Sequence, residues 1–218
     1  PNSARKTVHK QYLMLELREE LRVADETYAA GSLLAADFDA YMQGHREFTV
    51  LFHPSKTTAL AGYSWTKNYL ILNVLEDVKN TLSVLDPAKQ WQSSPMTDAP
   101  KIGTVSVSGV DDECSDDYQM ISTGYLSPTT LFYGTVGARP EMLKQLPAFF
   151  DASKHVVSQH FIISHDGERV PYFMVALKDL PLNGRNPTLL YGYGGFEISL
   201  TPGYSASVGR AWLNHGGV

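Results

Sequence analysis

One short pattern occurs three times along the chain: two polar residues, a tyrosine, and then a strand with alternating apolar residues. Its tyrosines are Tyr12, Tyr69 and Tyr118, so the copies are 57 and 49 residues apart. In the second and third copies another strand begins 13 residues after the tyrosine, at Leu82 and Leu131. Units of about 40 to 50 residues, each holding a small antiparallel sheet, are typical of β-propeller blades. The repeat therefore predicts part of a propeller, with chance similarity between short Tyr-Leu strings as the alternative.

The first copy is less regular than the other two. The segment that matches the second strand, Gly31-Ser32-Leu33, comes 21 residues after Tyr12, which predicts a longer loop. Leu13, Leu17 and Leu21 also have the i, i+4, i+8 spacing of an amphipathic helix. Comparison with the other two copies favours a strand here.

The first two thirds of the chain contain eight expected strands. Most are bounded by clusters of Gly, Pro, Asn, Asp or Ser, which favour turns. They are Tyr12–Leu17, Phe48–Phe52, Thr58–Ser64, Tyr69–Leu75, Thr81–Leu85, Gly103–Val107, Tyr118–Thr123 and Thr130–Thr135.

The pattern changes after Pro140. Glu141–Phe150 is expected to be a connector, and Ser158–Ser164 with Val170–Leu177 to be a hairpin across an Asp-Gly turn. A short apolar strand, Pro187–Tyr191, then leads into the glycine-rich loop Gly192-Tyr193-Gly194-Gly195-Phe196.

A helix is expected after this loop, over Ser205–Asn214. It would place Val208, Ala211 and Trp212 on one side and stop at Gly216. A strand, a loop and a helix in this order predict the opening of an α/β domain, cut before it closes.

Composition narrows the classes of function. The chain has 218 residues, 43% of them hydrophobic, and a formal charge of −5, so we expect no nucleic-acid partner. Its apolar runs are shorter than the roughly 20 residues that span a bilayer, so we expect no membrane partner. The single cysteine, Cys114, excludes an internal disulfide and a multi-cysteine zinc site.

The glycine-rich loop is the strongest candidate for chemistry. In α/β-hydrolases a loop after a strand supplies backbone N–H groups to the oxyanion hole. A tight structural turn is the simpler alternative. Neither a phosphate-binding loop nor a G-x-G-x-x-G motif is present.

Other candidates are rejected on sequence grounds. Ser64 and Ser205 lie in near misses of G-x-S-x-G, and Ser164-His165-Asp166 is expected to be a turn. The acidic run from Asp111 to Asp117 lacks the EF-hand pattern, and its charges should raise the pKa of Cys114. No metal site is expected from the seven histidines, which are His9, His45, His53, His155, His160, His165 and His215.

Several motifs together carry a family resemblance. They are Asp166-Gly167-x-x-Val170-Pro171-Tyr172-Phe173, Asn186 to Ser199 (NPTLLYGYGGFEIS), Thr201-Pro202-x-Tyr204-Ser205 and Trp212-Leu213-x-x-Gly216-Gly217-Val218. They resemble the prolyl oligopeptidase (prolyl endopeptidase) family of serine peptidases, most specifically over Ser158–Val218. A looser likeness extends upstream over Phe48–Pro54, Ser64–Asn73 and Leu143–Phe150. Oligopeptidase B has a different loop at the Tyr-Gly-Gly-Phe position.

The resemblance implies a mostly β fold: the last blades of a β-propeller over residues 1–148, then the N-terminal part of an α/β-hydrolase domain over residues 149–218. It also implies a serine endopeptidase that cleaves short proline-containing peptides after proline and uses no cofactor. Tyr193 matches the tyrosine that donates its hydroxyl to the oxyanion, and Phe196 matches an aromatic residue of the pocket for the substrate proline.

In the family, the Ser, Asp and His of the triad follow this loop, and they are absent here. We therefore expect a fragment that is inactive alone, from a protein that is monomeric when full length and cytoplasmic, or alternatively periplasmic. A non-catalytic propeller-type binding module is the competing hypothesis. An α/β-hydrolase acting on esters, or on peptides after basic residues, is a third.

Overall fold

The computed structural model describes residues 2–96, 99–196 and 198–218; Glu197 of the glycine-rich motif lies outside them. Strands hold 46% of the described residues and helices 8%, which confirms the prediction of a mostly β chain. The chain forms two units, residues 1–62 with 74–76 and residues 63–73 with 77–218.

The first sheet has four antiparallel strands in the order β1-β2-β5-β6. These strands are β1 (Arg5–His9), β2 (Tyr12–Glu16), β5 (Leu33–Asp37) and β6 (Thr49–Phe52). The longer loop expected after β2 contains a small hairpin, β3 (Leu21–Val23) with β4 (Glu26–Tyr28). Helix α1 (Phe38–Met42) was not expected; Asp37 caps it, because its carboxylate accepts a hydrogen bond from the Ala40 N–H at 2.8 Å.

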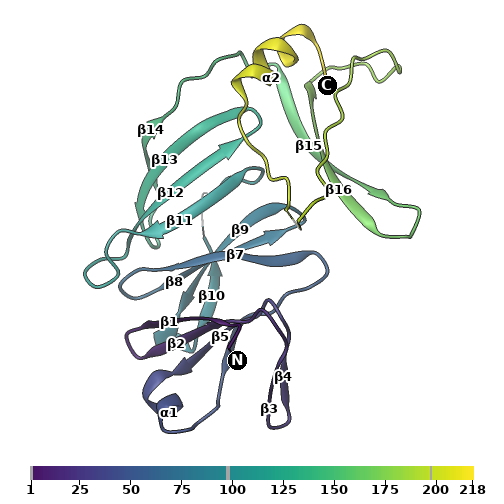
Figure 1. Ribbon diagram of the computed structural model, residues 1–218. Helices are drawn as coiled ribbons and strands as arrows, with labels where there is room; N and C mark the ends of the chain where they lie inside the picture. The colour runs from purple at the N-terminus through teal and green to yellow at the C-terminus, as the bar shows by residue number, and fades with distance from the viewer. Residues whose placement is uncertain (1, 97–98, 197) are drawn as a thin grey trace. The chain divides into compact units, whose positions relative to one another are not determined.

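Two further four-stranded sheets follow, and in both of them neighbouring strands are consecutive in the chain (Figure 1). One contains β7 (Thr58–Trp65), β8 (Leu70–Glu76), β9 (Lys79–Asp86) and β10 (Gln92–Pro95), with the 3-10 turn η1 (Pro87–Lys89) between the last two. The other contains β11 (Thr104–Gly109), β12 (Asp117–Gly124), β13 (Ser127–Thr135) and β14 (Glu141–Gln145).

These sheets explain the sequence repeat. Strands β2, β8 and β12, which carry the three copies of the tyrosine pattern, are each the second strand of their sheet. The ambiguous segment from Tyr12 is therefore a strand, as the comparison between copies predicted. All eight expected strands are present, with each end within three residues of its expected place.

One prediction about this region was wrong. Glu141–Phe150 was expected to be a connector, yet its first half is β14, which pairs with β13 across a register shift at Leu131 and Phe132. All five residues of β14 are exposed, so neither face of this strand is buried. A strand of this kind need not show the alternation of apolar and polar residues by which half-buried strands are predicted.

The β7–β10 and β11–β14 sheets share a hydrophobic core. Its buried members are Ile71, Leu82, Val105, Tyr118 and Met120. Two asparagine side chains also join the sheets through the backbone of Val105. The Asn73 amide donates to the Val105 carbonyl at 2.8 Å, and the Val105 N–H donates to the Asn80 amide oxygen at 2.9 Å.

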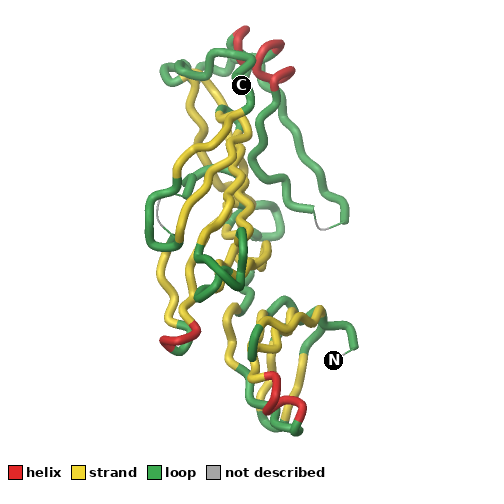
Figure 2. Tube along the Cα trace, turned by 90° about the vertical axis from the view of Figure 1, so that its left-hand side faces the viewer, coloured by secondary structure: helices red, strands yellow, loops and turns green. Residues whose placement is uncertain are grey.

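A long hairpin follows these sheets, with β15 (His155–Ile163) paired antiparallel to β16 (Arg169–Leu177). The expected hairpin is thereby confirmed. Most of the chain from β16 to residue 205 is loop (Figure 2). The expected strand Pro187–Tyr191 is not regular, because its backbone pairs only briefly, with Val218.

The expected C-terminal helix is shorter than predicted. It comprises α2 (Ala206–Ala211) and the 3-10 turn η2 (Leu213–His215), and it ends at Gly216 with φ of 80°. The expected side with Val208, Ala211 and Trp212 is not the buried one: Gly209 and Leu213 are buried, whereas Val208 is 41% exposed. Among the described residues, no helix has the length and apolar character needed to cross a membrane.

We predict that Gly134→Ala destabilises the chain by about 1–3 kcal/mol, because it overpacks the shared core. An added Cβ would lie 2.8 Å from the buried ring of Tyr118 and 3.1 Å from the Cα of Pro140. Urea denaturation followed by tryptophan fluorescence measures the change. Gly203→Ala is the matched control, since nothing lies within 4 Å of its added Cβ, and a loss of stability as large as that of Gly134→Ala would contradict the explanation.

Candidate functional site

The glycine-rich loop presents its aromatic side chains to solvent. Tyr193 is 48% exposed and Phe196 is 91% exposed, and Phe196 has a φ of 55°. Gly195 has a steric role, because a Cβ there would lie 3.2 Å from the Tyr193 hydroxyl oxygen. Glycine thus leaves room for the Tyr193 side chain to lie over the backbone of its own loop.

The N-terminal side of the loop is held by a backbone pairing. The Val218 N–H donates to the Pro187 carbonyl at 2.9 Å, and the Leu189 N–H donates to the Val218 carbonyl at 2.8 Å. When one residue bonds to two residues that flank a third, the strands run parallel. The chain therefore leaves this pairing through the loop and α2, and returns beside it in the same direction.

The C-terminal side of the loop is held against β11 and β12. The Thr104 hydroxyl donates to the carbonyl of buried Pro202 at 2.7 Å, and the Tyr204 N–H donates to the Thr123 hydroxyl oxygen at 3.3 Å. Thr104 and Thr123 are direct partners in the β11–β12 register. Two bonds from one cross-strand pair thus fix the point where the loop ends.

Helix α2 is docked by an aromatic ring. A Cβ on Gly209 would lie 1.9 Å from the ring of Phe150, so only glycine allows this approach. The same ring stacks on Tyr204, with centroids 5.3 Å apart and planes 9° apart, and meets the ring of His155 edge-on. The His155 Nε2 lies 3.2 Å from the carbonyl oxygen of Leu213, so β15 also holds the turn after α2.

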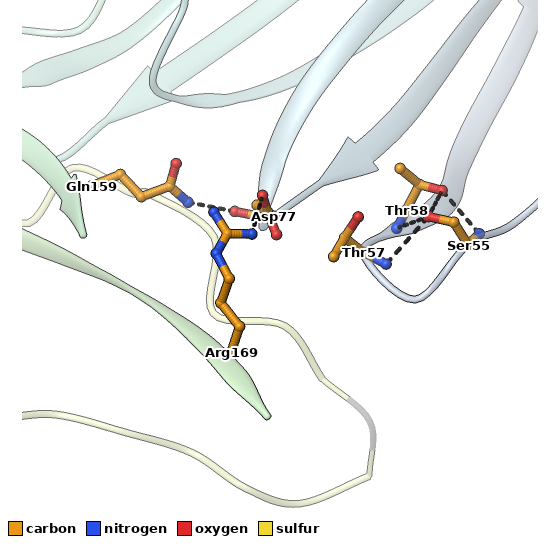
Figure 3. Close-up of polar contacts among 6 residues, drawn as sticks. All are labelled: Ser55, Thr57, Thr58, Asp77, Gln159 and Arg169. Carbon is orange, nitrogen blue, oxygen red and sulfur yellow. Dashed lines mark hydrogen bonds and ion pairs between the residues drawn. The ribbon is translucent and has the colours of Figure 1, made fainter. Parts of the chain in front are cut away.

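The hairpin makes polar contacts with the turn between β8 and β9 (Figure 3). The Gln159 amide donates to the Asp77 carbonyl at 2.6 Å, and an Arg169 nitrogen lies 3.4 Å from the Asp77 carboxylate. Because the Arg169 side chain is 48% exposed, this ion pair contributes less than about 1 kcal/mol. The ring pair of Tyr125 and Phe173, 5.6 Å apart, adds an apolar contact with the hairpin.

A separate polar turn precedes β7 (Figure 3). The Ser55 hydroxyl lies 2.7 Å from that of Thr58 and accepts from the backbone N–H groups of Thr57 and Thr58. These bonds join residues at most three apart along the chain, so they form a turn that starts the strand.

The serines that were rejected as nucleophiles form hydrogen bonds that stabilise local structure. Ser64 accepts from the Gly109 N–H at 2.9 Å, and Ser205 caps α2 by accepting from the Val208 N–H at 3.3 Å. Ser164 contacts Asp166 within the β15–β16 turn, where Gly167 has a φ of 86°. The turn interpretation of Ser164-His165-Asp166 is confirmed.

The acidic run is organised by bonds to its own chain. Asp111 accepts from the N–H groups of Glu113 and Cys114, both at 3.0 Å, and these bonds hold the pKa of its carboxyl below its usual range. Asp116 accepts from the Thr66 hydroxyl at 2.9 Å and from the backbone and side chain of Asn68, both at 2.7 Å. Across the described part of the chain, no group of three His, Cys, Asp or Glu residues is placed to hold a metal.

A cavity of about 390 Å³ lies between the β7–β10 and β11–β14 sheets, away from the loop. The Lys89 ammonium at its rim lies 3.0 Å from the Asp86 carboxylate. Buried Tyr118 is also part of its lining. No residue of this lining was predicted from the sequence to be a site residue. The lining contains neither Tyr193 nor Phe196.

Comparison with known proteins identifies the relatives of the chain. No family model matches the sequence. It is 40% identical over 190 residues to the uncharacterized peptidase y4nA of Sinorhizobium fredii, covering 86% of this chain and 26% of that protein. It is 33% identical over 138 residues to the prolyl endopeptidase of Elizabethkingia meningoseptica, covering 62% and 19%. The homologues and structural neighbours of the chain are members of the prolyl oligopeptidase family.

Solved structures of family members share its fold. The post-proline cleaving enzyme from Rickettsia typhi matches 100% of this chain and 32% of its own, with a TM-score of 0.79 at 23% identity. A prolyl endopeptidase structure matches 98% and 30%, with a TM-score of 0.78 at 23% identity. The chain thus spans about a quarter to a third of the Sinorhizobium protein and of these two structures. The match to the Elizabethkingia protein covers a smaller part of that protein.

The loop could be found from the sequence, but the residues that hold it could not. Phe150, His155 and Tyr204 were not expected to act together, since they lie in different segments with no shared periodicity. Gly209 was the signal in the sequence for this packing, because a glycine inside a short helix often marks a place where another side chain comes close to the helix backbone.

We predict that Cys114 is alkylated slowly. The negative charge of Asp111, followed by its hydrogen bond, raises the pKa of the Cys114 thiol. Less thiolate is then present at pH 8, and Asp111→Asn should lower the pKa and speed alkylation by iodoacetamide. Asp112→Asn removes a charge nearby and is the control. If both variants reacted at the wild-type rate, Asp111 would not control the thiol.

We predict that Asp116→Ala lowers the free energy of unfolding by about 1–3 kcal/mol, because it leaves the fully buried Thr66 hydroxyl without its charged acceptor. Chemical denaturation of the protein measures the loss. Glu113→Ala removes the same charge from the same segment and should change stability by less than about 0.5 kcal/mol. Equal losses in the two variants would show that charge, and not the bonds to Thr66 and Asn68, matters.

Proposed function

We propose that this chain is part of a serine-type endopeptidase that hydrolyses short peptides after proline. In this proposal residues 1–148 are the last blades of a propeller and residues 149–218 begin an α/β-hydrolase domain. The nucleophilic serine, the aspartate and the histidine come from outside these 218 residues, and the chain alone is inactive. The observation that carries the proposal is the exposed Tyr193 and Phe196 on a loop tethered at both ends.

Two features of the fold support this division. Three sheets of four strands, each containing one copy of the tyrosine pattern, are the units from which propellers are built. The parallel pairing of Val218 with Pro187 and Leu189, reached through α2, is the connection from which α/β sheets are built.

Tyr193 would stabilise the transition state. Acyl transfer places negative charge on the former carbonyl oxygen, and a phenol hydroxyl can donate a hydrogen bond to it. Tyr193 is 48% exposed, so its side chain is open to a bound peptide, and Gly195 leaves room for it. The flat, exposed ring of Phe196 offers an apolar surface that suits the pyrrolidine ring of a substrate proline.

We predict that Tyr193→Phe in the whole protein lowers kcat on a proline-containing peptide by about 10²–10³-fold, the loss typical of one oxyanion donor. Phe196→Ala should mainly raise KM, because it removes a binding surface that contacts the ground state and the transition state alike.

Steady-state kinetics on peptides with proline or arginine before the cleaved bond measure both effects. Turnover unchanged by Tyr193→Phe would sink the oxyanion assignment. Preference for the arginine peptide would support a peptidase of different specificity, and the absence of any turnover by the whole wild-type protein would support a binding module.

A further inference from the structure

Tyr204 connects the end of the glycine-rich loop to two other parts of the chain. Its hydroxyl accepts a hydrogen bond from the Phe149 N–H at 2.8 Å, and its ring stacks on Phe150 with centroids 5.3 Å apart. Its own N–H donates to the Thr123 hydroxyl oxygen at 3.3 Å. One side chain thus bonds to the segment before β15 while its backbone bonds to β12.

The partners of Tyr204 are themselves fixed. Phe150 is 7% exposed and lies between Tyr204, His155 and the backbone of Gly209. Thr123 is paired with Thr104 across β11 and β12, and Thr104 holds the carbonyl of Pro202, two residues before Tyr204. The anchor is therefore built on a sheet and on a packed ring.

The loop between the tethers contains Tyr193. The contacts found at its two ends are the pairing of Pro187 and Leu189 with Val218, and the anchor at Pro202 and Tyr204. Between them, Leu190 and Phe196 are more than nine-tenths exposed, so side-chain burial adds little to hold the middle of the loop. The direction in which Tyr193 points then depends on where the two ends are fixed.

We propose that Tyr204 is a positioning residue for Tyr193: it sets the register and tilt of the loop so that the Tyr193 hydroxyl meets the oxyanion. This inference rests on the proposed function. The Phe149 N–H that Tyr204 satisfies lies in an exposed residue, so water can replace the lost acceptor and the fold does not depend on it. A displacement of about 1 Å at a reacting group can cost about 10²-fold in rate, so catalysis is more sensitive to this bond than stability is.

A double-mutant cycle in the whole protein tests the inference. Tyr204→Phe keeps the ring stacked on Phe150 and removes only the hydroxyl bond. We expect it to lower kcat on a proline-containing peptide by about tenfold or more, with KM changed by less than about twofold and the melting temperature nearly unchanged. In a Tyr193→Phe background, where no hydroxyl remains to be positioned, Tyr204→Phe should change kcat little.

Tyr125→Phe is the matched control. Tyr125 also contacts an aromatic ring, that of Phe173, with the two planes tilted by 56°. Its hydroxyl takes no part in the bonds that hold Pro202 and Tyr204, so we expect the kcat of this variant to equal that of the wild type.

The outcomes separate the two proposals. If the whole wild-type protein does not cleave the proline-containing peptide, the proposed function fails. If it does cleave the peptide and Tyr193→Phe has full activity, the oxyanion role fails and the positioning role fails with it. If Tyr193→Phe is impaired but Tyr204→Phe has wild-type kcat, the positioning role alone fails. It also fails if Tyr204→Phe lowers kcat by the same factor in both backgrounds, because a general structural effect would be independent of the Tyr193 hydroxyl.

Discussion

The C-terminal third of the structure depends on the ring of Phe150 lying against the backbone of α2. The ring occupies the place that a side chain at position 209 would take. From this point it contacts His155 at the start of β15 and Tyr204 at the end of the glycine-rich loop. Hairpin, helix and loop thus share one buried ring, and a change in its position would affect all three.

The sheets could be predicted from sequence because their signals are local. The tyrosine pattern and the turn residues between strands identify β2, β8 and β12, and the Asp-Gly turn identifies the β15–β16 hairpin. Strand β14 could not be found in this way, since all its residues are exposed and pairing with β13 alone makes it a strand. Its backbone bonds are a tertiary property that no side-chain pattern records.

In the candidate site, too, the residues found from the sequence lie in a local pattern, and the contacts that were missed join distant segments. Tyr193 and Phe196 lie in a glycine-rich segment after an apolar run, a pattern that fits both an oxyanion loop and a tight turn. Their roles came from the family resemblance. Tyr204 was part of a matched motif, yet its partners Phe149 and Thr123 lie 55 and 81 residues away along the chain. Hydrogen bonds over such separations depend on how the sheets and the hairpin pack, so a single sequence does not predict them.

The order of strands in each sheet has a consequence for how the chain reaches its structure. Each four-stranded sheet uses strands that are consecutive, or are separated only by a small hairpin, so each can form as soon as its own segment is available. The pairing of Val218 with Pro187 closes a loop of about 30 residues that contains α2, the helix against which the Phe150 ring packs. During synthesis from the N-terminus the sheets would therefore form first, and the loop with Tyr193 would gain its final geometry among the last parts of this chain.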